Sequence, residues 1–215
     1  MNRPSPPQPR KRPKQSRSHL LVQAIQEACR TVLETEGPEH LSTQRIADVA
    51  GINIASLYQY YPNKEAILAE VFEEQIQQYT ASGRERILAI HELSLSSLED
   101  TLRAIVEMEV EQHLLLYRMD PVFYRVYHHS FDIHHRINEL TQSLDNPGWD
   151  EWFPGFLERH RSRLRDTDPH LLSRLTSHAL RSIPLSIMAT EPHLLEQAAF
   201  KEELFVMLLG YLCRD

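Results

Sequence analysis

The stretch LSTQRIADVAGINIASLYQYYPNKEAIL, residues 41–68, has the pattern of two short helices joined by a tight turn and followed by a third helix. Ser42 or Thr43 can accept hydrogen bonds from the unpaired amides at the start of the first helix. Gly51 stands where that helix must end, in a position suited to the left-handed conformation that glycine adopts at little cost. Asn53 is placed to cap the second helix. Two helices with a Gly-containing turn predict a helix-turn-helix, whose second helix enters the major groove of DNA.

The same residues resemble the N-terminal domain of the TetR/AcrR family of bacterial transcriptional regulators. The matching features are Thr43, Ile46-Ala47, Ala50-Gly51-Ile52, Leu57-Tyr58, Tyr61, and Asn63-Lys64-Glu65 leading into Leu68. The resemblance covers about the first third of the chain and implies a DNA-binding head on a helical body that holds a small-molecule cavity. An ordinary three-helix cluster is the alternative interpretation of the pattern.

The composition favours an all-α protein. Glycine is scarce, with 6 in 215 residues, and no segment alternates apolar and polar residues as a half-buried strand does. We therefore predict an N-terminal three-helix helix-turn-helix domain and a C-terminal helical domain for ligand binding and dimerisation. The expected divisions are a disordered, basic, Pro-rich arm (1–16), the DNA-binding domain (17–65) and the regulatory and dimerisation domain (66–215).

The charge is divided unevenly along the chain. The net charge is -7, but residues 1–75 hold nine basic and nine acidic side chains, and residues 1–19 hold six basic and none acidic. A locally basic end attracts a polyanion even when the whole chain is acidic. A solvated tail of no consequence is the alternative. The two cysteines near opposite ends and the absence of a membrane-length apolar run or signal peptide lead us to expect a cytoplasmic protein with free thiols.

Cap residues and prolines predict the helix boundaries of the remaining chain. Ser18 is expected to cap the first helix, and the pairs Asp120-Pro121 and Asp168-Pro169 to open later ones. Further helices are expected over 122–130, 133–144 (a continuation of the one before), 149–164 and 195–212.

The resemblance assigns DNA contacts residue by residue. Ile54 and Ala55 cannot hydrogen-bond through their side chains, so they would read bases by apolar contact. Tyr58 and Tyr60 are expected to point outward to phosphates, whereas Tyr61 is expected to pack in the core. The predicted DNA-binding residues are Thr43, Gln44, Asn53, Ile54, Ala55, Ser56, Tyr58, Tyr60 and Lys64.

Aromatic residues gather in the middle of the chain, and the resemblance implies that some of them line a cavity for a small lipophilic effector. Rings that simply fill a core are the alternative. The predicted ligand-binding residues are Tyr117, Phe123, Tyr127, Trp149, Trp152, Phe153 and Phe156.

The last two helices are apolar nearly all round, which is more than one subunit can bury. A homodimer would also place two recognition helices on a palindrome. A core within a single subunit is the alternative. The predicted interface residues are Leu180, Ile183, Ile187, Leu204, Leu208 and Tyr211.

A histidine-rich segment, 128–135, permits a second interpretation. On one continuous helix His128, Asp132 and His135 would share a face and could bind a divalent metal ion. A solvated histidine surface is the simpler interpretation, so we assign no metal, no cofactor and no catalytic residue. The sequence thus predicts a ligand-responsive repressor that binds a palindromic operator as a homodimer, and no enzyme. The alternative is a metal-dependent hydrolase or metal sensor that uses the 128–135 cluster.

Overall fold

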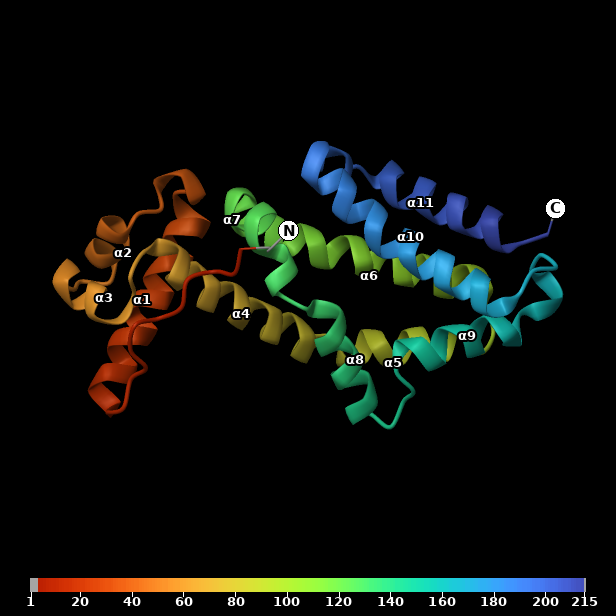
Figure 1. Ribbon diagram of the computed structural model, residues 1–215, viewed down its shortest axis with the longest axis horizontal. Coiled ribbons are helices and arrows are strands. Elements are labelled where there is room, and N and C mark those ends of the chain that lie inside the picture. The colour runs from red at the N-terminus through yellow and green to blue at the C-terminus, as the bar shows by residue number, and fades with distance from the viewer. Residues whose placement is uncertain (1–3, 215) are drawn as a thin grey trace. The chain divides into compact units, whose positions relative to one another are not determined.

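The computed structural model describes residues 4–214 of the protein. These residues form eleven α-helices and four short 3-10 helices (Figure 1). The α-helices are α1 (Ser16–Thr35), α2 (Thr43–Val49), α3 (Ile54–Tyr60), α4 (Lys64–Ser82), α5 (Arg84–Leu93), α6 (Leu98–Met119), α7 (Pro121–Tyr127), α8 (Ile133–Ser143), α9 (Trp149–Arg159), α10 (Pro169–Thr190) and α11 (Ala198–Leu212). The 3-10 helices are η1 (Pro38–His40), η2 (His128–Ser130), η3 (Arg161–Arg163) and η4 (Pro192–Leu194). The predicted all-α fold is confirmed. No helix in this part of the chain has the length and apolar character needed to cross a membrane.

Contacts within the chain define two compact units. Unit 1 comprises the residues up to 78 together with 116–132, and unit 2 comprises 79–115 and the residues from 133 onward. Unit 1 therefore contains the helix-turn-helix together with α7 and η2. Unit 2 contains α5, α8, α9, α10 and α11.

The core of unit 1 forms around one face of α1, where Ile25, Cys29 and Val32 are fully buried. Burial raises the pKa of the Cys29 thiol to about 12, so this cysteine is a neutral core residue. The helix begins at Ser16 and not after Ser18, because Ser18 occupies the third helical position and its Oγ accepts a hydrogen bond from the Gln15 amide. The prediction of Ser18 as the cap is therefore wrong by one turn.

The helix-turn-helix forms as the sequence predicts. Ser42 Oγ accepts from the Arg45 amide at the start of α2, and Asn53 Oδ1 accepts from the Ala55 amide at the start of α3. Gly51 joins the two helices at a φ of 66°, in the left-handed region. The Ile52 amide then donates to Ala47 O, which closes the end of α2. The turn thus satisfies backbone groups that the ends of two short helices would otherwise leave unpaired.

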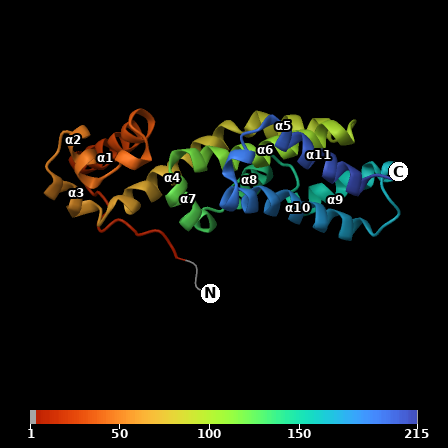
Figure 2. The ribbon, with the colours of Figure 1, turned by 90° about the horizontal axis from the view of Figure 1, so that it is seen from above.

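In unit 2 the long helices α10 and α11 lie side by side in both views (Figures 1 and 2). An antiparallel bridge between Leu164 and Cys213 joins the chain before α10 to the end of α11. Leu164 was expected inside a helix over 149–164, but α9 ends at Arg159 and Leu164 is extended. The helix α5 was not predicted at all, and it supplies Ile87 and Ile90 to the core of unit 2.

Candidate nucleic-acid interface and ligand cavity

One side of α3 is open to solvent and the other is buried. Ala55, Tyr58 and Gln59 are exposed, with 38% of Tyr58 accessible, whereas Leu57 is fully buried. Positions 55, 58 and 59 share a helix face by their spacing of three and four residues. A helix of this kind can lay its exposed face in a groove while its buried face holds it to the head.

The exposed tyrosine is held in place by the preceding helix. Tyr58 Oη and Thr43 Oγ1 are 2.9 Å apart and share a hydrogen bond between the first residue of α2 and the middle of α3. Gln44 is exposed, and its amide donates to Asp48 Oδ1 at 2.8 Å. Asn53 is exposed and acts as a cap, while Ile54 and Ser56 are half-buried. The predicted positions therefore lie together around the start and outer face of α3, and their contact with DNA remains a prediction.

Tyr60 is the exception, because only 7% of it is accessible. It follows Leu57 by three residues and so lies on the inner face of α3. Tyr61 follows the helix in an extended conformation and is also buried. The expectation that Tyr60 points outward is wrong. The assignment of Tyr61 to the core is confirmed, and its Oη donates to the Glu70 carboxylate. Gln59 was overlooked, although the spacing from Ala55 would have identified it.

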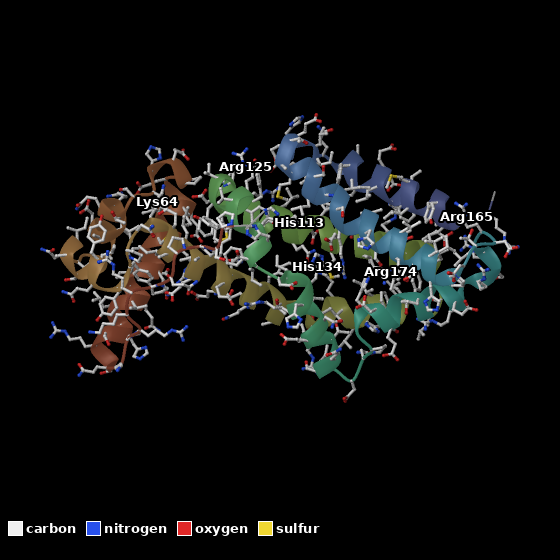
Figure 3. All side chains as sticks on the ribbon, viewed as in Figure 1. Lys64, His113, Arg125, His134, Arg165 and Arg174 are labelled. Atoms are coloured by element: carbon white, nitrogen blue, oxygen red, sulfur yellow. The ribbon has the colours of Figure 1, made fainter. Side chains whose placement is uncertain are left out.

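The basic arm lies beside this helix. The Arg10 amide donates to Tyr60 O at 2.7 Å, and the Arg10 guanidinium donates to Tyr58 O at 3.3 Å. Nearer the N-terminus, Pro4 O accepts a hydrogen bond from His129 at 2.9 Å. The predicted disorder of a free arm stays a prediction. Lys64 also lies in unit 1, and its Nζ donates to Leu41 O, so a phosphate contact would need this side chain to turn outward (Figure 3).

Unit 2 contains a cavity with a volume of about 60 Å³. Its walls come from α5, α6, α8, α9 and α10 and are mainly apolar. The apolar side chains in the wall are Ile87, Ile90, Ile105, Met108, Ile137 and Leu180. Trp149 and Trp152 complete the wall, and the buried Trp152 indole N–H has no hydrogen-bond partner among the described residues.

A buried carboxylate lines this cavity. Glu109 on α6 is 4% exposed, and its two oxygens lie 2.9 and 3.1 Å from His134 Nε2 on α8. His113 Nε2, one turn further along α6, lies 3.3 Å from the same carboxylate. The two imidazoles approach it from two helices (Figure 3). Burial raises the pKa of Glu109, but hydrogen bonds from His113 and His134 and their charges outweigh it and hold the pKa at about 2.

One arginine and a second histidine also line the cavity. Arg181 lines the cavity, and its guanidinium carbon lies 5.4 Å from the centre of the Trp149 ring. His91 also lines the cavity, beside Trp152. Burial, and then the charge of Arg159, lower the pKa of His91, which keeps this imidazole neutral at pH 7.

The structure does not bring the seven predicted ligand-binding rings to one place. Of these, Trp149 and Trp152 line the cavity of unit 2. Phe153 and Phe156 are fully buried in the core beside them, and Trp149 stacks on Phe153 at 4.6 Å. The remaining three, Tyr117, Phe123 and Tyr127, belong to unit 1, where Phe123 packs against Phe72. The seven rings therefore belong to two different units, and their contact with a ligand stays a prediction.

The proposed metal cluster does not form on one helix. The chain leaves the helical conformation at Phe131, between η2 and α8, so His128 and His135 stand on different elements. Within residues 4–214 no three His, Cys, Asp or Glu side chains are placed to hold a metal ion. The metal-dependent alternative therefore has no support.

Three of the six predicted interface residues are buried within their own chain. Leu180, Leu204 and Leu208 are at most 4% exposed, and Leu180 lines the cavity of unit 2. They are corrected from interface to core, because their side chains are already buried within one chain. Ile183, Ile187 and Tyr211 are half-buried. The exposed apolar residues of the two helices are Leu171, Leu175, Val206 and Met207.

Glu109, His113 and Arg181 are the site residues that sequence reasoning missed. A signal for the first two was present, since they continue the buried register of Leu102, Ile105 and Val106 along α6 and place polar groups on an apolar face. Arg181 gives no comparable signal, because arginines on a helix surface are ordinary.

Two family models match the chain. The model described as "Bacterial regulatory proteins, tetR family" matches residues 25–71, and "Tetracyclin repressor-like, C-terminal domain" matches residues 97–212. Among solved structures the chain resembles NalD, the secondary repressor of the MexAB-OprM multidrug efflux pump in Pseudomonas aeruginosa, with 21% identity, a TM-score of 0.49, and coverage of 94% of this chain and 100% of that one. It also resembles SmeT, the repressor of the Stenotrophomonas maltophilia multidrug efflux pump SmeDEF, with 15% identity, a TM-score of 0.49, and coverage of 90% and 91%. The comparison with curated proteins found no match.

Proposed function

Because the chain belongs to the tetR family of bacterial regulatory proteins, we propose that it is a ligand-responsive repressor that binds a palindromic operator as a homodimer in the cytoplasm. As a member of that family the chain is a DNA-binding transcriptional regulator. The observation that supports the proposal most is the exposed face of α3, with Ala55, Tyr58 and Gln59 open to solvent and the basic arm beside it. This is a binding and regulatory function, and we propose no catalytic step.

The exposed residues of α3 and their neighbours would have two roles, contact with bases and contact with phosphates. Gln59 can hydrogen-bond to the edge of a base, and Ala55 can contact a thymine methyl group. Tyr58, positioned by Thr43, and Lys64 would contact phosphates and set the register without choosing a sequence. The arm supplies further charge, which adds affinity and salt dependence.

The experiment selects operator sequences from a random pool of double-stranded DNA and then measures binding by fluorescence anisotropy. Tyr58→Ala and Lys64→Ala should weaken binding to the selected operator and to unrelated DNA alike, because phosphate contacts do not depend on sequence. Gln59→Ala should mainly reduce discrimination at one base pair, by about 1–3 kcal/mol.

Gln77→Ala is the matched control, because Gln77 is an exposed glutamine on α4 of the same unit and should leave both affinities unchanged. If Gln59→Ala weakens all sequences equally while Tyr58→Ala affects the operator alone, the assignment of the two roles is reversed. If the selection enriches no sequence, the repressor proposal fails.

Two copies of α3 are needed to read a useful length of DNA. A two-fold related pair reaches half-sites about 34–36 Å apart. The outer faces of α10 and α11 expose Leu171, Leu175, Val206 and Met207, and these residues support dimerisation through the last two helices.

Regulation would follow from a shift between two conformations of the dimer. A ligand in the cavity of unit 2 that prefers the conformation with mismatched recognition helices would lower the affinity for the operator. A coupling of about 1–3 kcal/mol is typical of such linkage.

A further inference from the structure

The cavity of unit 2 adjoins a second depression on the surface of the same unit. This cleft lies between α9 and α10 and has a volume of about 420 Å³. Trp149 and Arg181 line both spaces, so these two side chains form the wall between the cavity and the cleft. The cavity alone holds little more than water, whereas a site that joins the two would have the volume of an ordinary small-molecule site.

The cleft is lined by arginine and histidine residues from one face of α10. His170, Arg174, His178 and Arg181 follow one another at spacings of four, four and three residues, which places them in one row. Asp150 is the acidic residue in the lining. Neither Arg174 nor Arg181 forms an ion pair with a carboxylate within the described part of the chain, and Arg174 stands on α10 at the cleft (Figure 3). Within residues 4–214, the two guanidinium groups of the cleft are therefore not neutralised by an ion pair, and Asp150 is the acidic side chain that lines the cleft with them.

The carboxylate that lines the cavity already has partners. The Glu109 carboxylate is buried and hydrogen-bonds to His134 Nε2, and His113 Nε2 lies 3.3 Å from it. A ligand cation would have to compete with these two imidazoles for the same oxygens. Arg181, in contrast, has no carboxylate partner among the described residues, and its guanidinium carbon lies 5.4 Å from the centre of the Trp149 ring. This difference favours an anion at Arg174 and Arg181 on α10.

We propose that unit 2 binds an amphipathic carboxylate, with its acid group at Arg174 and Arg181 and its hydrocarbon body in the cavity behind Trp149. The apolar wall of the cavity suits a hydrocarbon chain, and the planar guanidinium groups suit a carboxylate. The ligand displaces Arg181 from Trp149 and opens the wall between the two spaces. This assignment rests on the proposed function, for which it names the class of effector.

The test uses the full-length protein and its own fluorescence. The chain has two tryptophans, Trp149 and Trp152, and both line the cavity, so tryptophan emission reports on this site. The probes are decanoate, decan-1-ol and decyltrimethylammonium, which share a ten-carbon chain and differ in charge. Hexanoate and tetradecanoate extend the length series. We expect saturable changes in emission, with decanoate binding more tightly than the neutral and the cationic probe.

The variants Arg181→Gln and Arg174→Gln should each raise the dissociation constant for decanoate about tenfold, because each removes a charge-assisted contact. Arg165→Gln is the matched control, since Arg165 is an exposed arginine of the same unit that lies over Tyr211, outside the cleft (Figure 3). It should leave the constant within about twofold of its original value. The affinities for decan-1-ol should be unchanged in all three variants.

The proposal is overturned if decyltrimethylammonium or decan-1-ol binds as tightly as decanoate, if no acid of the series saturates, or if the two cleft variants bind decanoate like the original protein. Operator binding is measured separately and distinguishes the two proposals. A protein that binds no DNA but needs Arg181 to bind decanoate supports the ligand assignment and refutes the repressor function. A protein that binds its operator but no carboxylate refutes the ligand assignment alone.

Discussion

Glu109 shows at the scale of one residue how a charge is kept inside unit 2. The two imidazoles of His113 and His134 offset the loss of hydration that burial imposes on the carboxylate. The folded protein therefore favours the ionised form, and the pKa of Glu109 lies at about 2, below its ordinary value of 4.5. Stability from this group is fully present above pH 4.5 and is lost as the pH falls toward about 2.

Glu109→Gln should lower the free energy of unfolding at pH 7 by about 1–3 kcal/mol, since it weakens hydrogen bonds to a buried charge. The difference between the variant and the original protein should shrink as the pH is lowered from 4.5 to about 2. Urea unfolding at a series of pH values measures the loss of stability at pH 7 and its dependence on pH. Glu107→Gln, on the exposed side of α6, is the control and should change stability by less than about 0.5 kcal/mol at any pH. A difference that stays constant down to pH 2 would show that Glu109 is not held ionised.

At the scale of an element, the turn between α2 and α3 depends on one backbone conformation. Gly51 has a φ of 66°, and a Cβ built there would meet no atom within 4 Å, so Gly51→Ala introduces backbone strain without a clash. We expect a loss of about 1–2 kcal/mol in the free energy of unfolding. Gly155→Ala in α9 should act in the opposite direction, with a gain of about 0.5–1 kcal/mol, because its Cβ would meet only Arg159 at 3.9 Å. Chemical denaturation of both variants checks the signs, and a stabilised Gly51→Ala would contradict the account of the turn.

The helices that the sequence predicts well are those that begin directly after a capping side chain. Asn53, Asp120 and Asp168 each accept a hydrogen bond from an amide two residues later, and α3, α7 and α10 begin where these caps predict. The helix α5 has no such signal, because Gly83 precedes it without a side-chain cap. It is held by packing in the core of unit 2, which no local pattern reveals.

The two candidate sites differ in the same respect: local spacing predicts one of them and does not predict the other. The outer face of α3 follows from helical spacing alone, although the same spacing places Tyr60 inside. The cavity of unit 2 requires Ile87, Glu109, His134, Trp149 and Arg181 to meet from five helices. The positions of these residues in the sequence do not indicate that they lie together in the fold. Aromatic residues that belong to two different units can therefore be mistaken for one cluster.

At the scale of the whole molecule, the proposed function depends on a second copy of the chain. The apolar residues that α10 and α11 leave exposed are the ones available for this contact, and about half of Val206 is accessible, at 51%. Burying such residues against a two-fold related copy removes apolar surface from water in both subunits at once. The half-buried Ile183, Ile187 and Tyr211 would extend the contact from the same two helices.

Val206→Glu should raise the dissociation constant of the dimer at least about tenfold, because the contact would bury an uncompensated carboxylate from each subunit. Sedimentation equilibrium measures the dimer, and anisotropy with a full palindrome and with a single half-site measures DNA binding. Affinity for the palindrome should fall while affinity for the half-site is kept, since α3 is untouched. Leu95→Glu is the control, because Leu95 is even more exposed, at 70%, but lies between α5 and α6. Equal weakening of half-site and palindrome would mean that the substitution damages the head, whereas an intact Val206→Glu dimer would place the subunit contact on another face of the chain.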